Sequence, residues 1–219
     1  MVATARRPFA TVLAIMSAVA AISAVVALIP REPDIVEGTA VVGAVLDDPG
    51  SPAFGPANAD VTVVDFSDYQ CGPCKQGEPA FEKAVAADGR VRVIYKDWAA
   101  LGPISKTEAE IALAAQRQGR YLAVHRALLR SRVRASPETL RVLLVGAGVD
   151  WPRLTSDLAR DKYAIDVQLS RHAFQAWSLG VQGPPAYLVG PYLVRGRLNE
   201  GSLRSLIRKA RRHHRARNG

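Results

Sequence analysis

The only two cysteines of the chain, Cys71 and Cys74, stand two residues apart where an apolar run gives way to a helical pattern. A thiol at the start of a helix faces unpaired backbone N–H groups and the positive end of the helix dipole. Both favour the thiolate, the species that attacks or leaves in disulfide exchange. A second cysteine one turn later can close a disulfide with little backbone movement. The spacing therefore predicts a redox pair.

Half of a zinc site is the competing interpretation of two cysteines at this spacing. Zinc takes four ligands, and the histidines available are His125, His172, His213 and His214. None of them belongs to a second cluster of ligands. We therefore expect no metal and no cofactor.

The elements around the pair form a recognisable unit. Residues 61–66 are β-branched and apolar, which predicts a buried strand; a helix is expected from Cys71 to about Asp88, ended by Gly89. A second strand is expected over residues 91–95. Two strands joined by a helix form a βαβ unit, so we expect them to be parallel.

The rest of the chain divides by composition. Residues 31–59 are rich in proline, glycine and acids, which is typical of a linker; residues 40–46 are apolar and predict a short edge strand. Residues 104–180 show no strand pattern and predict three or four helices, with caps at Ser136 and Asp150 and ends at Gly148 and Gly180. A hairpin follows around Gly190-Pro191, then a closing amphipathic helix over residues 202–212.

The first thirty residues predict a membrane segment. Arg6 and Arg7 precede an uncharged stretch over residues 9–29, long enough to span a bilayer at roughly 20 apolar residues. The charges on either side favour a cytoplasmic N-terminus in a bacterial-type inner membrane, with the remainder in the periplasm or another extracytoplasmic space. An uncleaved anchor and a cleaved signal segment are both open. Either places the cysteines in an oxidising compartment.

The net charge of +9 raises the question of an anionic partner. Much of it lies in a basic tail, residues 208–219, where no aromatic side chains are interleaved to stack bases. We therefore expect no nucleic-acid partner. The tail is expected either to be solvated or to contact anionic lipid.

Two motifs carry a family resemblance: VDFSDYQCGPCK at residues 64–75 and GPPAYLVG at residues 183–190. With the order of elements, they make the chain similar to DsbA-like thiol:disulfide oxidoreductases of the thioredoxin superfamily. The resemblance implies an α/β fold: a thioredoxin domain over residues 60–207 with a helical domain inserted at about 104–180, preceded by the anchor or signal segment.

The resemblance assigns roles to the cysteines and their neighbours. Cys71 is implied to be the more exposed and nucleophilic thiol, and Cys74 the thiol that resolves the mixed disulfide. Gly72 and Pro73 are implied substrate contacts; relatives often carry histidine beside the second cysteine, so its absence implies a less oxidising pair. Asp65, six residues before Cys71, is implied to be a buried acid that exchanges a proton with Cys74. Val64 and Phe66 favour burial, whereas a solvated or turn-capping aspartate is the alternative.

The second motif places a proline opposite the cysteine pair. Pro185 matches the cis-proline of the family, which shapes the groove for an extended substrate. Pro184 stands where relatives carry a residue whose backbone pairs with substrate, and proline lacks the N–H for one of those bonds. A Pro-Pro turn without a substrate role is the alternative.

Several other residues have open roles. Lys96 is expected either to pair with Asp65 or to face solvent, while Lys75 and Glu78 either tune the charge of the pair or are merely solvated. The three tryptophans are expected to be packing residues, and His125 and His172 ordinary helix residues. Pro79 is expected inside the helix that follows the cysteines.

These observations predict a membrane-anchored, extracytoplasmic thiol:disulfide oxidoreductase. Its partners would be proteins with cysteines or disulfides and a membrane redox partner. Direction is open, because oxidase, reductase and isomerase differ in reduction potential against the compartment. A non-catalytic, membrane-tethered thioredoxin-like binding module is the alternative.

Overall fold

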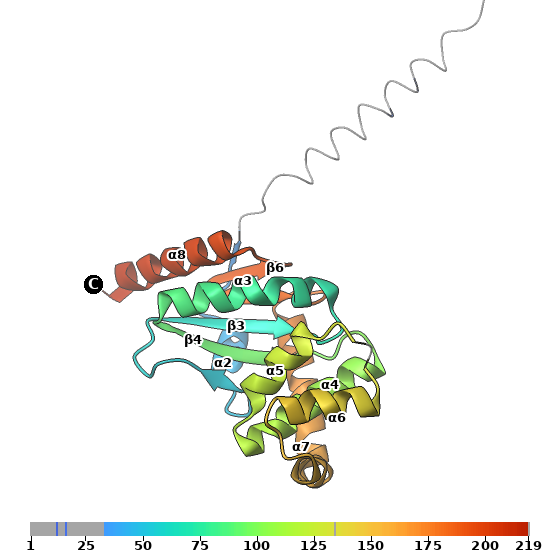
Figure 1. The fold of residues 1–219 in the computed structure, drawn as a ribbon. Helices are drawn as coiled ribbons and strands as arrows, with labels where there is room; N and C mark the ends of the chain where they lie inside the picture. The colour runs from blue at the N-terminus through green and yellow to red at the C-terminus, as the bar shows by residue number, and fades with distance from the viewer. Residues whose placement is uncertain (1–11, 13–15, 17–32, 134, 219) are drawn as a thin grey trace, which may run out of the picture. The chain divides into compact units, whose positions relative to one another are not determined.

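A computed structural model describes residues 12, 16, 33–133 and 135–218. Residues from Asp34 onward carry a six-stranded sheet in the order β1-β6-β5-β3-β4-β2. Strands β3 and β4 are parallel, and the other neighbouring pairs are antiparallel. Figure 1 shows α3 running alongside the central strands. The strands are β1 (Asp34–Ile35), β2 (Ala53–Phe54), β3 (Val61–Ser67), β4 (Val91–Asp97), β5 (Ala186–Val189) and β6 (Tyr192–Arg195).

The βαβ unit predicted around the cysteines is confirmed. Helix α3 (Gly72–Asp88) joins β3 to β4 and contains Pro79. It ends at Gly89, whose φ of 70° lies in the left-handed region that glycine adopts without steric cost. The parallel pair therefore brings the ends of β3 and β4 together beside the start of α3.

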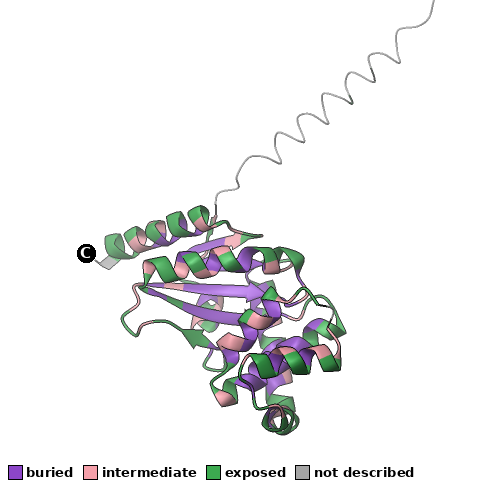
Figure 2. Cartoon of the chain, viewed as in Figure 1, coloured by how far each residue is buried: buried purple, intermediate pink, exposed green. Residues whose placement is uncertain are grey.

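The two faces of the sheet support two apolar cores, because successive side chains of a strand point to opposite sides. Val63, Val93 and Val189 belong to a core shared with α3, α8 and the helices of the central block. Val64, Ile94 and Leu188 belong to a core shared with α2 and the end of α7. Figure 2 shows the central strands buried along their length.

The central block is helical, as predicted. It comprises α4 (Pro103–Ala115), a short 3-10 turn (Gln116–Gln118), α5 (Tyr121–Arg130), α6 (Pro137–Gly146) and α7 (Trp151–Ser178). Ser136 and Asp150 cap α6 and α7 through side-chain bonds to Thr139 N and Arg153 N, which confirms both predicted caps. Helix α5 packs against both α3 and α4, so this block reaches the cysteine-bearing helix.

The hairpin after this block is also confirmed. Strands β5 and β6 pair antiparallel around Gly190, with Val189 opposite Tyr192. Strand β5 lies next to β3, in register from Val63–Val189 to Phe66–Ala186. The hairpin therefore places the residues before Ala186 near the carboxyl end of β3.

The segment predicted to be a linker is folded from Asp34 onward. The prediction of an edge strand over residues 40–46 is wrong. Residues Ala40–Leu46 form helix α2, in which Thr39 Oγ1 accepts a bond from Val42 N and Val42 and Val45 are buried. The apolar side chains follow a helical spacing with a cap residue before them. The edge strands are instead β1 and β2, on opposite edges of the sheet.

Lys96 neither pairs with Asp65 nor faces solvent, so both expectations for it are wrong. Its Nζ lies 3.0 Å from Asp48 Oδ2 and 2.8 Å from Ser51 Oγ, and the side chains of Lys96 and Asp48 are fully buried. As an even-numbered residue of β4, Lys96 points to the α2–α7 face, away from Asp65. Burial favours the neutral form of Asp48, but the hydrogen bond and charge of Lys96 lower its pKa. The other hydrogen-bond partners of the Asp48 carboxylate are Gly50, Ser51, Gln168, Arg171 and Gln175.

The basic tail is part of a helix rather than a separate segment. Helix α8 spans Glu200–Asn218, further than the predicted residues 202–212. Arg211 forms ion pairs with Asp60 and Asp88, and Arg217 pairs with Glu37. Two of the tail's six lysines and arginines are therefore paired with acidic residues of the fold, whereas Arg208, Arg212 and Arg215 are exposed.

Two further expectations concern the tryptophans and the predicted membrane segment. Trp98 is buried as predicted, but Trp177 is 68% exposed and contributes little to packing. The predicted membrane segment falls almost wholly outside the described residues. Among the residues that are described, no helix has the length and apolarity needed to cross a membrane.

Replacing Asp48 by asparagine should destabilise the protein, because Lys96 would keep a buried charge without its counter-ion. We expect a loss of about 3–5 kcal/mol in the free energy of unfolding, measured by urea denaturation followed by circular dichroism. The control is Asp47→Asn, an exposed neighbour, which should change stability by no more than about 0.5 kcal/mol. Equal losses in the two variants would contradict the assignment.

Candidate active site

The two cysteines lie where β3 delivers the chain to α3. Cys71 is the N-cap residue of α3, and its Sγ accepts a hydrogen bond from Cys74 N at 3.1 Å. The two sulfurs are joined in a disulfide with a Cα–Cα distance of 5.2 Å, within the usual range for such bonds. When the pair is reduced, the same N–H and the helix dipole favour the Cys71 thiolate. This geometry matches the redox pair predicted from the spacing.

The expected difference in exposure between the cysteines is wrong, since each is only 3% exposed. Cys71 is covered from the other side of the site, with its Sγ 3.6 Å from the carbonyl oxygen of Pro184. Gly72 and Pro73, between the cysteines, are exposed. This dipeptide is therefore the exposed part of the turn that carries the two cysteines.

The bond between Pro184 and Pro185 is cis, as the resemblance implied. Pro185 is buried and Pro184 is half-buried, so the loop is fixed at its base and accessible above. Its position against Cys71 argues against a Pro-Pro turn unrelated to the site. A substrate role for Pro184 and Pro185 stays a prediction.

Asp65 is buried in the middle of the sheet, as Val64 and Phe66 predicted. In the register of β3 it lies between Tyr95 of β4 and Tyr187 of β5. Burial and the nearby Glu78 carboxyl raise the pKa of Asp65 well above its ordinary value, against a weak hydrogen bond from Ser67. Its proton exchange with Cys74 stays a prediction.

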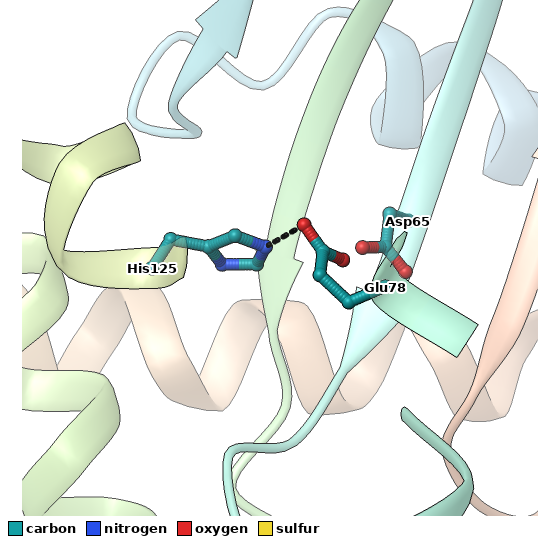
Figure 3. Close-up of side chains that lie close together, drawn as sticks. All are labelled: Asp65, Glu78 and His125. Carbon is teal, nitrogen blue, oxygen red and sulfur yellow. Dashed lines mark ion pairs between the residues drawn. The ribbon is translucent and has the colours of Figure 1, made fainter. Parts of the chain in front are cut away.

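Glu78, for which the sequence left charge tuning and solvation open, lies in the site, and so does His125, to which the sequence analysis gave no site role. Glu78 lies one turn after Cys74 on the buried face of α3, and His125 is fully buried on α5. Figure 3 shows Glu78 between His125 and Asp65, with its Oε1 3.8 Å from His125 Nε2. Burial raises the pKa of Glu78 to about 7, and burial lowers that of His125 to about 3. The solvated role for Glu78 and the ordinary role for His125 are therefore wrong.

A second buried carboxyl lies beyond His125. Asp97, at the end of β4, accepts hydrogen bonds at Oδ1 from Tyr69 at 2.7 Å and Tyr121 at 2.9 Å. The Tyr69 hydroxyl also lies 3.0 Å from His125 Nδ1. Burial raises the pKa of Asp97 to about 7 despite these bonds. Polar contacts thus run from the cysteine-bearing helix through α5 to β4.

Local signals for these residues exist in the sequence. Glu78 follows Cys74 by four residues, which places both on one side of a helix. His125 lies four residues after Tyr121 and three before Leu128, on the buried face of an amphipathic helix. His172 is likewise fully buried, against Asp48 and Lys96, rather than an ordinary helix residue. Helical periodicity predicts that these side chains are buried. It does not predict which charged residues they contact, because those contacts depend on tertiary packing.

Disulfide chemistry explains why these parts occur together. A capped thiol, a second thiol one turn behind it, an opposing proline loop and buried acids suit dithiol–disulfide exchange, so fold and site define a thiol:disulfide oxidoreductase with a thioredoxin fold. The comparison with known families agrees. The chain belongs to the thioredoxin family, since the family model described as Thioredoxin matches residues 47–209.

Solved structures share this fold and confirm the DsbA-like resemblance. A thioredoxin-like oxidoreductase from Silicibacter pomeroyi DSS-3 is 31% identical, covering 77% of this chain and 96% of that chain, with a TM-score of 0.72. The thiol-disulfide exchange protein alpha-DsbA2 from Wolbachia pipientis is 25% identical, covering 76% and 90%, also with a TM-score of 0.72.

A curated relative is much longer than this chain. The Na(+)/H(+) antiporter NhaA 1 of Salinispora arenicola (strain CNS-205) is 27% identical over 158 residues, which are 71% of this chain and 24% of that protein. The chain therefore spans about a quarter of the length of this relative.

Replacing Glu78 by glutamine should remove a pH-dependent cost of folding. A carboxyl whose pKa rises from 4.5 to about 7 on folding binds its proton more tightly in the folded state, so stability falls as pH rises through that window. Glu78→Gln should therefore gain about 3 kcal/mol at pH ~8 relative to its effect at pH ~4, measured by urea denaturation at both pH values. Glu138→Gln, an exposed control, should show no such difference. A Glu78→Gln effect that is the same at both pH values would refute the buried-acid assignment.

Proposed function

We propose that the protein exchanges disulfides with cysteine-containing protein substrates through Cys71 and Cys74, in an extracytoplasmic compartment. The observation that carries the proposal is a disulfide whose first sulfur caps a helix and faces the Pro184 loop. The exposed Gly72-Pro73 dipeptide and the half-buried Pro184 would line the substrate path.

In the oxidising direction, a substrate thiolate attacks Cys71 Sγ. The Cys71–Cys74 bond breaks, its electron pair goes to Cys74 Sγ, and Asp65 gives that sulfur a proton. A second substrate thiolate then attacks the substrate sulfur of the mixed disulfide and expels Cys71 as a thiolate held by the helix N-terminus. The substrate leaves oxidised, its two thiol protons go to solvent, and the pair is left reduced. The reverse sequence reduces a substrate disulfide.

The direction of exchange depends on the reduction potential of the pair. Proline between the cysteines supplies no positive charge. Among the contacts described for Cys71 Sγ, the Cys74 N–H at the helix N-terminus is the one that stabilises a thiolate. This supports a potential less oxidising than that of relatives with histidine beside the second cysteine.

The membrane location is proposed from the sequence. The uncharged residues 9–29, preceded by Arg6 and Arg7, would anchor the domain with the N-terminus in the cytoplasm. A membrane redox partner would then restore the starting state of the pair.

Serine substitutions should separate the roles of the two cysteines. Cys74→Ser should accumulate a mixed disulfide with scrambled, disulfide-containing RNase, because the Cys71 thiolate attacks an RNase disulfide, one RNase sulfur leaves as a thiolate, and the resolving thiol is absent. Cys71→Ser should form none and should lose exchange down to the uncatalysed background. Non-reducing electrophoresis with mass spectrometry identifies the adduct. Retained exchange in Cys71→Ser would rule out this mechanism.

Adding an imidazole beside Cys74 should make the pair more oxidising. We expect Pro73→His to move the potential, measured by equilibration with glutathione, toward the oxidising end of the known range at about −120 mV and away from about −270 mV. Gln76→His places the same group on an exposed position of the next turn and should leave the potential nearly unchanged. A Pro73→His potential equal to that of the wild type would show that charge at this position does not set the redox balance.

A further inference from the structure

Three buried polar atoms behind the cysteine pair have no hydrogen-bond partner: Asp65 Oδ1, Glu78 Oε1 and His125 Nε2. They come from three elements, β3, α3 and α5, and one potential ligand atom of each residue lies within 4.8 Å of those of the other two (Figure 3). Each of the three residues is at least 97% buried. Unpaired buried polar groups are costly, so the cluster needs a proton or a cation among its members.

The hydrogen bonds on the far side of His125 fix its tautomer. Tyr69 has one hydroxyl hydrogen, and an ionised Asp97 can only accept, so that hydrogen lies in the 2.7 Å bond to Asp97 Oδ1. His125 Nδ1 must then carry a hydrogen and donate it to the Tyr69 oxygen at 3.0 Å. Nε2 is left with a lone pair directed at Glu78, which suits a protonated Glu78 carboxyl.

The same chain of groups has a second arrangement. In this arrangement the Glu78 proton has moved to His125 Nε2. The hydrogen of His125 Nδ1 has moved to the Tyr69 oxygen, and the Tyr69 hydrogen has moved to Asp97. No group gains a net charge except the two ends, where Glu78 becomes a carboxylate and Asp97 becomes neutral. The pKa of each end group is about 7, so neither end holds the proton much more tightly. The Glu78–His125 distance of 3.8 Å exceeds a hydrogen bond, so this link closes only when Glu78 moves toward the ring.

We propose that Glu78, His125, Tyr69 and Asp97 form a buried proton path that connects the active-site carboxyls to a second carboxyl at the end of β4. The proposal rests on the proposed disulfide exchange. The path supplies a proton from the second arrangement, in which Asp97 is protonated, Glu78 is a carboxylate and His125 Nε2 carries the hydrogen. When Asp65 gives its proton to the Cys74 thiolate, the Asp97 proton moves to Tyr69, Tyr69 passes its own to His125 Nδ1, and Nε2 passes its own to Glu78. Glu78 then protonates Asp65. His125 and Tyr69 are positioning residues, since they act on the sulfur through the carboxyls.

Other charged and titratable groups face this path. They set a common electrostatic background that the variants below leave in place. They are Glu82 on α3, Arg126 and Arg130 on α5, Tyr95 on β4, Tyr187 on β5, and Asp68 after β3.

Two tyrosines provide a matched test. Tyr69 and Tyr121 are both buried and both donate to Asp97 Oδ1, but the hydroxyl of Tyr69 also bonds His125. Tyr69→Phe cuts the path, whereas Tyr121→Phe removes an equivalent donor and leaves the path intact. The readout is the rate at which dithiothreitol reduces the Cys71–Cys74 disulfide of the full chain, from about pH 5 to about pH 9, a range that brackets the pKa values of both end carboxyls.

For Tyr69→Phe we expect the inflection of the rate–pH curve near neutral pH to move by about one pH unit. The reduction rate at neutral pH should fall about tenfold. This loss is smaller than the 10²–10⁴-fold contribution of a complete general acid or base. Tyr121→Phe removes one hydrogen bond to Asp97 but keeps the Tyr69–His125 link, so it should move the inflection less than Tyr69→Phe and cause no comparable loss of rate. If Tyr69→Phe does not fold, Asp97→Asn removes the end of the path and should shift the inflection in the same way. Wild-type profiles for Tyr69→Phe and Asp97→Asn would overturn the path alone, whereas absence of exchange in the wild type would overturn the proposed function.

A cation in the cluster is the competing outcome. The probe is Zn²⁺, titrated into the oxidised protein so that the cysteines cannot act as ligands. Stoichiometric binding that raises the melting temperature of the wild type and is lost in His125→Ala would overturn the proton path. We expect no saturable Zn²⁺ binding that depends on His125.

Discussion

The fold depends on how charge is buried on the two faces of one sheet. On one face, Lys96 and Asp48 neutralise each other and are surrounded by hydrogen-bond partners. On the other face, Asp65 and Glu78 are buried together without a counter-ion, and His125 beside them is held neutral. The alternation of side chains along β3 and β4 keeps the two sets apart. The Lys96–Asp48 pair holds the N-terminal segment against the sheet. The opposite face, where the buried acids lack hydrogen-bond partners (the unsatisfied face), carries groups with raised pKa values.

The unsatisfied face lies beneath the reactive disulfide for a geometric reason. A parallel βαβ connection brings the chain from the end of β3 directly into α3, so the residue at the turn caps the helix. Here that residue is Cys71. The next turns of the same helix carry Cys74 and Glu78 on its buried side, above a strand that carries Asp65. The spacing of a helix and the pleat of a strand thus align a thiol with two acids, and α5 adds His125 from a distant part of the chain.

Local patterns predicted the parts of the fold that local forces determine. Caps at Ser136 and Asp150, the end of α3 at Gly89 and the hairpin at Gly190 follow from short sequence signals, and the structure confirms them. Residues 40–46 were misread because a short apolar run fits a strand as well as a helix. The partners of Lys96 and His125 lie 48 and 47 residues away in sequence, so no local pattern indicates them. The site was therefore predictable at the cysteines, at Asp65 and at Pro185, but not in the charges behind them.

The protonation state of the buried acids also affects the thiolate in front of them. An ionised carboxylate near the pair would disfavour a second negative charge at Cys71 and oppose the effect of the helix N-terminus. Burial raises the pKa of both carboxyls, so they carry less negative charge beside the pair while remaining available as acids. Because the chain has proline rather than histidine at position 73, it lacks a positive charge that would offset such repulsion. Keeping the acids neutral is then the way in which this site preserves a stabilised thiolate with backbone dipoles alone.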